Sequence, residues 1–206
     1  SARLNPLARG PRRTGVTDDQ DEQVVRQRRA ATLISLVEMT VDTGRLTAAE
    51  HACIHLALER AVTASGGSPT LRHVHDQLEA IAGGTIEVDS DLRQAVSGPR
   101  YAMRRFVSGD LSGLFEDEST VAFDEDAPMV VVDTSELFAR GDLVAQLTQV
   151  CTTAWVQAVI SDRDARRTRY VIREEGWRDM SSLAALQMYQ QWLKLSRHYG
   201  ISNIVI

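Results

Sequence analysis

From residue 109 onward, short runs of apolar and β-branched residues alternate with stretches of helical periodicity. The helical patterns cover about 137–161 and 179–199, and the apolar runs are "TVAF" (120–123), "PMVVVDTS" (128–135), "RYVIREE" (169–175) and "SNIVI" (202–206). Continuously apolar runs are typical of strands buried on both faces, and their alternation with amphipathic helices indicates βαβ units. This part of the chain is therefore predicted to be α/β, with a parallel sheet and flanking helices.

Before residue 109 the patterns predict helices only. Apolar residues recur at helical spacing over about 18–43, 46–62, 70–81 and 89–107, the last interrupted by "SGP". Thr47 and Glu50 form a capping-box pattern, and Gly83-Gly84 provides a C-terminal stop. We therefore divide the chain into an irregular segment (1–17), an all-helical subdomain (18–108) and an α/β part (109–206).

Composition narrows the classes of function. The net charge of −5 argues against a strongly basic nucleic-acid surface, and no apolar run is long enough to span a membrane. Cys53 and Cys151 both lie in apolar helical patterns, which predicts buried thiols in a reducing compartment. Lys194 is the only lysine and has no glycine near it, so the chain contains no phosphate-binding loop of the form G-x-x-x-x-G-K-[ST].

Three carboxylates end apolar runs of the predicted sheet. Asp133 ends "MVVVD", the apolar-run-then-Asp pattern of a Walker B motif, and Glu174 and Glu175 end "YVIREE". Ligands of parallel α/β proteins bind outside the carboxyl ends of the strands. ATP hydrolysis needs one carboxylate for Mg²⁺ and a second group to position the attacking water. Neighbouring residues of a strand point to opposite faces, but Gly176 permits the turn that would let both glutamates serve one phosphate.

Each of these carboxylates also has a structural interpretation. Asp133 is well suited to a turn or to a helix N-cap. Glu174 and Glu175 would form a solvated strand end, with Arg173 and Glu175 paired on one face. The local spacing leaves both alternatives open.

Other motifs favour structural roles. His51 and His55 share a helix face but lack the further ligands of a metal site. Trp155, Trp177 and Trp192 are predicted to be core or interface anchors rather than base-stacking platforms. "PRYAMRRF" (99–106) mixes arginines with aromatic residues and could contact phosphates, but a helix with a solvated basic face is the preferred interpretation.

Six phrases, in order along the chain, resemble one family: the ATPases of conjugative type IV secretion systems of the VirB/TraC type. The phrases are "RLNPL", "GRLTAAEHACI", "SPTLRHVHDQL", "GDLSGLFEDESTVAF", "APMVVVDTSEL" and "RYVIREEGWRDM". The last resembles the Walker B phrase of the family, "lvlDEaW.ll". The resemblance implies a RecA-like P-loop motor core with a helical insertion ahead of the Walker B strand.

The resemblance also implies roles for single residues. Glu174 falls where the family has the Asp that holds Mg²⁺ through water, Glu175 on the catalytic Glu, and Trp177 on its Trp. Glu in place of Asp keeps the charge but adds a methylene group, and Arg173 replaces an apolar residue. The implied cofactors are ATP and Mg²⁺.

The resemblance implies partners as well: other secretion-system subunits, further copies in a hexamer, and the inner membrane, reached peripherally from the cytoplasm, with DNA as a possible ligand. The phosphate-binding loop should lie upstream of Ser1, and the sensor and arginine-finger segments downstream of Ile206. We therefore expect a fragment that does not hydrolyse ATP alone. The alternatives are a DNA translocase or coupling motor of the same fold, and a non-catalytic partner-binding module.

Overall fold

The chain forms a helical half and a smaller α/β layer. The computed structural model describes residues 3–13, 15–41, 44–120, 127–160, 168–174, 186, 189–190, 192–194, 196 and 200–206. The helices of the first half are α1 (Asp18–Thr40), α2 (Ala48–Ala64), α3 (Leu71–Ala82), α4 (Ser90–Ala95) and α5 (Ser97–Ser108). The second half contains α6 (Ser135–Phe138), α7 (Asp142–Ile160), β1 (Arg169–Arg173) and β2 (Ile201–Val205). The predicted fold class, a helical subdomain followed by part of an α/β core, is confirmed.

Side-chain caps determine where several helices begin. The backbone N–H of Glu50 donates to the Thr47 hydroxyl (3.3 Å), and that of Thr47 donates to the Glu50 carboxylate (2.8 Å), as the capping-box pattern predicts. Thr17 and Thr70 cap α1 and α3 in the same reciprocal way. Each cap satisfies backbone N–H groups that have no partner within the helix.

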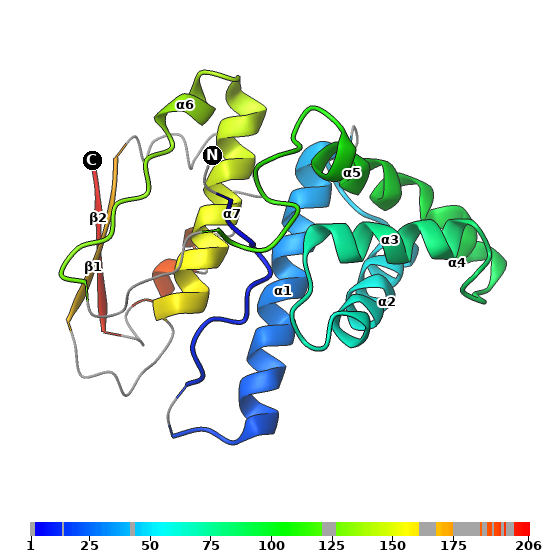
Figure 1. The fold of residues 1–206 in the computed structure, drawn as a ribbon, viewed down its shortest axis with the longest axis horizontal. Helices are drawn as coiled ribbons and strands as arrows, with labels where there is room; N and C mark the ends of the chain where they lie inside the picture. The colour runs from blue at the N-terminus through cyan, green and yellow to red at the C-terminus, as the bar shows by residue number, and fades with distance from the viewer. Residues whose placement is uncertain are drawn as a thin grey trace.

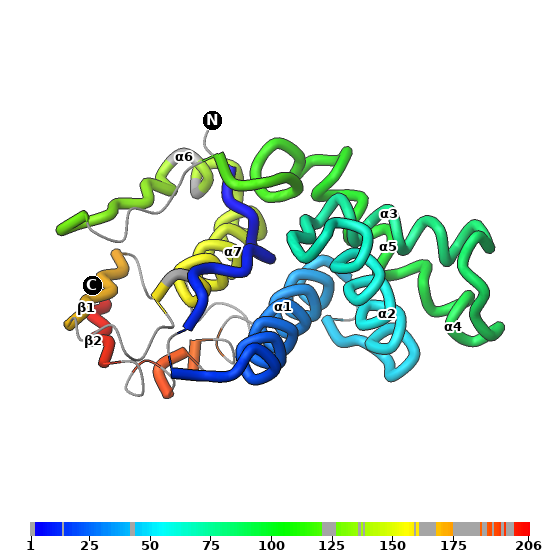
Figure 2. Tube along the Cα trace, turned by 60° about the horizontal axis from the view of Figure 1, so that its bottom comes forward, coloured from blue at the N-terminus to red at the C-terminus, as the bar shows by residue number. Residues whose placement is uncertain are grey.

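β1 and β2 pair in parallel, with Arg169 opposite Ile201 and Arg173 opposite Val205. In both Figure 1 and Figure 2 the order across the molecule is sheet, α7, α1 and then the remaining helices of the first half. The N-terminal segment runs between α1 and α7. One connected hydrophobic core extends from Leu36 and Phe106 in the helical half to Trp155 of α7 and to Trp192.

Arg29 holds the N-terminal segment in place from inside this core. Its side chain is almost fully buried, and it donates from Nε to the carbonyl oxygen of Leu7 (2.7 Å) and from Nη2 to that of Gly67 (3.0 Å). Burial lowers the pKa of its guanidinium from the usual value. Two carbonyl partners offset part of the cost of burying a charge, so one side chain of α1 joins the N-terminal segment to the loop after α2.

The prediction of a buried strand at 128–135 is wrong in the described structure. Met129, Val130, Val131 and Val132 lie in an irregular segment, and Met129 and Val131 are 76% and 73% exposed. The run has the composition of a strand, but a strand also needs a hydrogen-bonding neighbour. Among the described residues β1 and β2 pair only with each other. Residues 121–123 of "TVAF" and most of the predicted helix at 179–199 lie outside the described residues.

Candidate functional site

The carboxyl end of β1 carries the one candidate catalytic residue that the structure describes. Glu174 directly follows Arg173, the last residue of the strand, and is exposed. The backbone N–H of Ile206 donates to the carbonyl oxygen of Arg173 (2.9 Å), so the ladder between the strands continues to this point. Glu175, Gly176 and Trp177 lie outside the described residues. The structure therefore places Glu174 where ligands of parallel sheets bind, and leaves its pairing with Glu175 a prediction.

Arg173 points to the other side of the strand, toward the helices. Its Nη2 donates to the Thr153 hydroxyl on α7 (3.0 Å), and its guanidinium carbon lies 5.2 Å from the centre of the Tyr189 ring. Thr153 and Tyr189 are buried. Sequence reasoning missed this cluster, although the period-two alternation of "RYVIR" signals that Arg173 and Val171 share a face.

Asp133 acts as a turn residue. Its Oδ1 accepts hydrogen bonds from the backbone N–H of Ser135 (2.9 Å) and from the Ser135 hydroxyl (2.6 Å) at the start of α6. These bonds, above all that from the hydroxyl, lower the pKa of the Asp133 carboxyl. Both bonds stabilise the start of α6, which favours the structural alternative for Asp133.

The resemblance of the sequence predicts ATP and Mg²⁺ as cofactors, and the strand end can be compared with what Mg²⁺ requires. Mg²⁺ is bound through one or two carboxylates, water and substrate phosphates, and an exposed carboxylate at a strand end fits the protein's share of that set. The described residues contain no group of three His, Cys, Asp or Glu side chains that could hold a metal by themselves. Glu174 thus fits a water-mediated contact to a cation that arrives with nucleotide phosphates. His51 and His55 lie on α2 with no third ligand among the described residues.

A pocket of about 560 Å³ lies elsewhere. Its lining comes from the amino-terminal half of β2 and the helical residues before it: Leu193, Lys194, Ser196, Ile201, Ser202 and Asn203. Because β1 and β2 are parallel, the amino end of β2 is at the opposite edge of the sheet from Glu174. This pocket is therefore separate from the candidate site, and Lys194 lies there with an exposed side chain.

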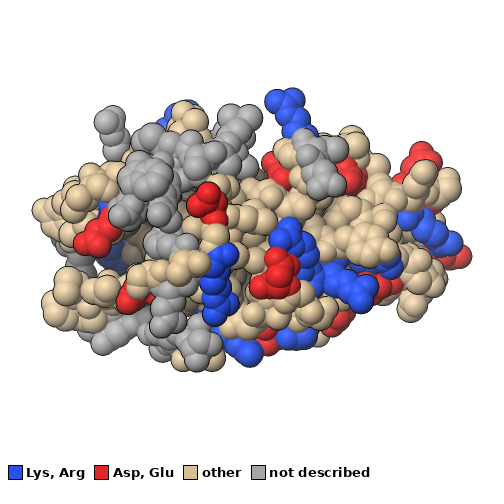
Figure 3. Space-filling model, turned by 90° about the horizontal axis from the view of Figure 1, so that it is seen from above, with Lys and Arg blue, Asp and Glu red and all other residues tan. Residues whose placement is uncertain are grey.

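The remaining candidate residues have structural roles. Trp155 and Trp192 are buried, which agrees with their predicted role as core anchors. On α5, Arg105 pairs with Asp110 (2.7 Å) and Arg100 with Glu79 (3.4 Å). Figure 3 shows acidic and basic side chains interspersed over the face it presents, rather than gathered by sign. These arginines belong to ion pairs at the surface, as in the solvated-helix interpretation.

Cys53 and Cys151 are free and buried, as the sequence predicts. Burial raises the pKa of the Cys53 thiol, and raises that of Cys151 well above the usual value. A thiol that resists deprotonation is a poor nucleophile and a poor metal ligand. Both cysteines therefore act as small core residues.

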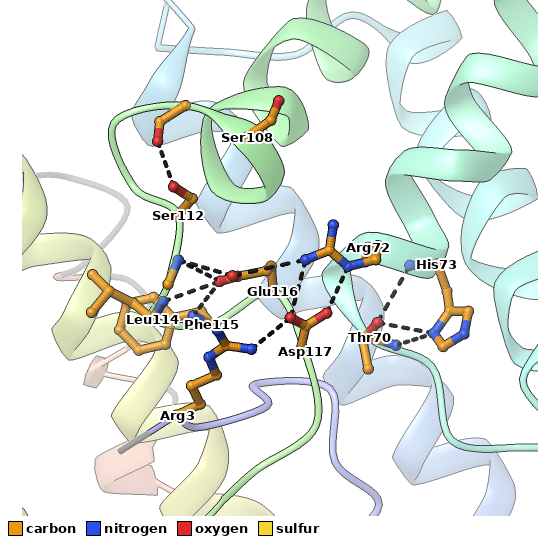
Figure 4. A network of polar contacts seen from close by, with 12 residues as sticks. Arg3, Thr70, Arg72, His73, Ser108, Ser112, Leu114, Phe115, Glu116 and Asp117 are labelled. Atoms are coloured by element: carbon orange, nitrogen blue, oxygen red, sulfur yellow. Dashed lines mark hydrogen bonds and ion pairs between the residues drawn. The ribbon is translucent and has the colours of Figure 1, made fainter. Parts of the chain in front are cut away.

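A polar network joins the N-terminal segment and the start of α3 to the segment that follows α5 (Figure 4). Asp117 accepts hydrogen bonds from Nε of Arg72 (2.6 Å), Nη2 of Arg72 (3.0 Å) and Nη1 of Arg3 (2.8 Å). The backbone joins the same segments, through Leu4 N–H to Leu114 carbonyl (3.2 Å) and Thr120 N–H to Arg3 carbonyl (3.1 Å). We call the contacts of residues 3–5 and Arg72 with residues 113–120 the clasp.

The Glu116 carboxylate occupies a concave loop inside the clasp. It is almost fully buried and accepts hydrogen bonds from three successive backbone N–H groups, those of Gly113 (2.9 Å), Leu114 (3.0 Å) and Phe115 (3.2 Å). Gly113 has φ +92°, a conformation that glycine adopts readily. The phrase "GDLSGLFEDE" (109–118) thus has a structural role in joining the halves.

Comparison with known proteins agrees with this fold. No protein-family profile and no curated protein sequence matches the chain. Among solved structures, VirB4 of Thermoanaerobacter pseudethanolicus is similar, with a TM-score of 0.72 and 20% sequence identity. The similarity covers 99% of this chain and 53% of the VirB4 chain, so this chain spans about half the length of the VirB4 structure it matches. At this identity the likeness shows the fold, and the conclusion is that this chain has the fold of about half of a VirB4 protein.

Proposed function

We propose that the chain is part of the ATP-hydrolysing motor of a type IV secretion system, of the VirB/TraC type, which powers pilus assembly or the transfer of DNA or protein. The observation that carries the proposal is the similarity of almost the whole chain to VirB4. The ordered phrases of the sequence agree with it. The exposed Glu174 at the carboxyl end of β1 supplies a carboxylate where a nucleotide-binding site of this fold needs one.

In this proposal the two glutamates have separate tasks. Glu174 orients the water shell of Mg²⁺, and Glu175 positions the water that attacks the terminal phosphate. When bound, Mg²⁺ supplies neutralisation of the charge on the phosphate oxygens. The side chain of Glu174 is one methylene longer than that of the Asp in the Walker B phrase of the family. The Glu174 side chain must therefore fold back for its carboxylate to occupy the position of the Asp carboxylate.

The isolated chain is proposed to be inactive. Its single lysine, Lys194, lies beside the pocket at the amino end of β2, with no glycine-rich loop before it. The backbone N–H groups and the lysine that cradle nucleotide phosphates would therefore come from outside the 206 residues. Without that cradle, a strand-end carboxylate has little affinity for ATP.

The proposed assembly follows the family. We infer that the complete motor acts as a homo-oligomer, a hexamer, together with other secretion-system subunits, on the cytoplasmic side of the inner membrane and in peripheral contact with it. None of the described helices has the combination of length and apolar character required to cross a membrane.

The test compares the isolated chain with a full-length protein that carries a phosphate-binding loop. We expect Mg²⁺-dependent ATP hydrolysis by the full-length protein, about a hundredfold or more slower with Glu175→Gln, and none by the isolated chain. Asp133→Asn is the matched control, because Asp133 also follows an apolar run but acts in a turn, and it should hydrolyse ATP at the parental rate. An inactive full-length protein would instead favour a partner-binding module, and strong stimulation by DNA would favour a translocase.

A further inference from the structure

At Arg173 this chain differs from the Walker B phrase of the family that it resembles. Arg173 lies directly before the candidate site. The family phrase has an apolar residue at this position, directly before the acidic pair that corresponds to Glu174 and Glu175. An arginine on the helix-facing side of a strand loses hydration, which destabilises the fold unless the guanidinium finds partners. The contacts of Arg173 therefore have to explain how it is accommodated on this side of the strand.

The contacts of Arg173 join three elements at the carboxyl end of β1. The side chain donates to Thr153 on α7 (3.0 Å) and lies over Tyr189, in the chain before β2 (5.2 Å). Its carbonyl oxygen accepts from the backbone N–H of Ile206 (2.9 Å), just beyond β2. Thr153 is 5% exposed and Tyr189 is 7% exposed, so the partners are themselves held by packing.

We propose that Arg173 is a positioning residue of the ATPase site, which fixes the carboxyl end of β1 and thus where Glu174 is presented. The inference rests on the proposed function. A planar guanidinium held by a hydroxyl and an aromatic ring has little freedom to rotate. Since catalysis is sensitive to displacements of about 1 Å, a fixed strand end contributes to the rate of the chemical step.

The same strand provides a matched control. Arg169 is the other inward-facing arginine of β1 and donates to the carbonyl oxygen of Ile160 (3.1 Å). It lies at the amino end of the strand, five residues before Glu174 and at the opposite end of β1. Replacing either arginine with methionine removes a charge and keeps the aliphatic part of the side chain. Comparing the two variants therefore separates a change in the catalytic rate from a general loss of stability of β1.

The experiment measures kcat, KM for ATP and thermal stability in the full-length protein for Arg173→Met, Arg173→Lys, Thr153→Val and Arg169→Met. For Arg173→Met we expect kcat to fall about tenfold or more with KM within about twofold, as for an interaction that matters mainly in the transition state. Arg173→Lys should recover part of the loss, because lysine keeps the cation over Tyr189. Arg169→Met should lower the melting temperature to a similar degree and leave kcat unchanged.

A double mutant separates the mechanism from general damage. If Thr153 acts through Arg173, the double variant Arg173→Met/Thr153→Val should be no slower than Arg173→Met alone. Parental kcat in Arg173→Met overturns the inference and leaves the proposed function in place. An inactive parent overturns both. Should Arg173→Met fail to fold, parental kcat in Thr153→Val has the same meaning.

Discussion

At the scale of single residues, the clasp shows how two adjacent carboxylates take different tasks. Glu116 turns into the loop and accepts from its own backbone, whereas Asp117 turns outward between Arg3 and Arg72. The first forms a tight turn, and the second joins segments that lie far apart in the sequence. Their energetic contributions should therefore differ in size and in dependence on pH.

Replacing Glu116 by alanine should destabilise the chain strongly. The change leaves three backbone N–H groups of a buried loop without their acceptor, and we expect a loss of roughly 2–4 kcal/mol in the free energy of unfolding. Denaturant titration measures the loss. Glu118→Ala is the control, since Glu118 is exposed and its hydrogen bond from Nδ2 of Asn5 is long (3.5 Å), so stability should change by less than about 0.5 kcal/mol. Equal losses in both variants would contradict a special role for Glu116.

Asp117 should contribute stability that depends on pH. The hydrogen bonds from Arg72, followed by the charges of Arg72 and Arg3, hold its pKa below the ordinary value. A carboxyl whose pKa is depressed by folding stabilises the protein fully above its unfolded pKa of about 4, and this stabilisation is lost as the pH falls through the folded pKa.

Asp117→Asn should therefore cost about 1 kcal/mol at pH 7, a value that takes account of the partial exposure of the pair, and less than that near pH 2. Denaturant titrations at both pH values measure the difference. Asp110→Asn is the matched control, because Asp110 also accepts two bonds from one arginine but only from Arg105, five residues away. A larger loss of stability in Asp110→Asn than in Asp117→Asn would contradict the expected contribution of the Asp117 ion pairs.

At the scale of elements, the close approach of the N-terminal segment to α7 depends on Gly10. Its φ is +77°, and a Cβ atom added there would lie 2.0 Å from the carbonyl oxygen of Ala158. Gly10→Ala therefore combines backbone strain with a steric clash, and should lower the free energy of unfolding by about 2–4 kcal/mol. Gly66→Ala, with φ +63° and no atom within 4 Å, should show the strain alone, about 1–2 kcal/mol. Similar losses in calorimetry would contradict the close contact.

Helices were more predictable than strands because their signals are local. The start of α2 follows from Thr47, and α3 lies where the pattern over 70–81 predicts it. The break between α4 and α5 falls at Val96, one residue before the predicted interruption "SGP", which instead forms the first turn of α5. The helix predicted at 137–161 is divided into α6 and α7 near Gly141, which has φ +116°. Met129–Val132 has strand composition but no pairing partner in the described structure, and such a partner cannot be inferred from a local pattern.

For the candidate site too, the local features were predictable and the contacts between elements were not. The location of Glu174 at a strand end follows from one apolar run, and the structure confirms that location. The contacts of Arg173 could not be predicted, since Thr153 lies 20 residues earlier and on another element. The clasp could not be predicted from local patterns either, because Arg3 and Asp117 are 114 residues apart.

At the scale of the whole molecule, exposed apolar side chains are unevenly distributed. Among the described residues, the helical half exposes one large apolar side chain, Tyr101, and the α/β part exposes several, among them Val131, Tyr170, Ile172 and Ile206. Tyr170 and Ile172 lie on the face of β1 that points away from the helices. Exposed apolar patches on sheets favour association.

We expect the isolated chain to associate through this sheet face as its concentration rises. Ile172→Lys should reduce the weight-average mass in sedimentation or light-scattering experiments without lowering the melting temperature, because Ile172 contributes little to the core. Tyr101→Lys is the control on the helical half and should leave association unchanged. An equal effect of both substitutions would show that association is not specific to the sheet.

The clasp has a further consequence for how such a chain could change over generations. Because residues 3–5 and 114–120 are joined side by side, the stretch of chain that holds α1–α5 begins and ends at one place. A short turn between these segments would bypass α1–α5 without altering the connection between β1 and β2. Helices could thus be lengthened, exchanged or lost as a unit, provided that the surface of α7 facing α1 becomes polar at the same time. The arrangement makes the helical half modular, although one hydrophobic core spans both halves.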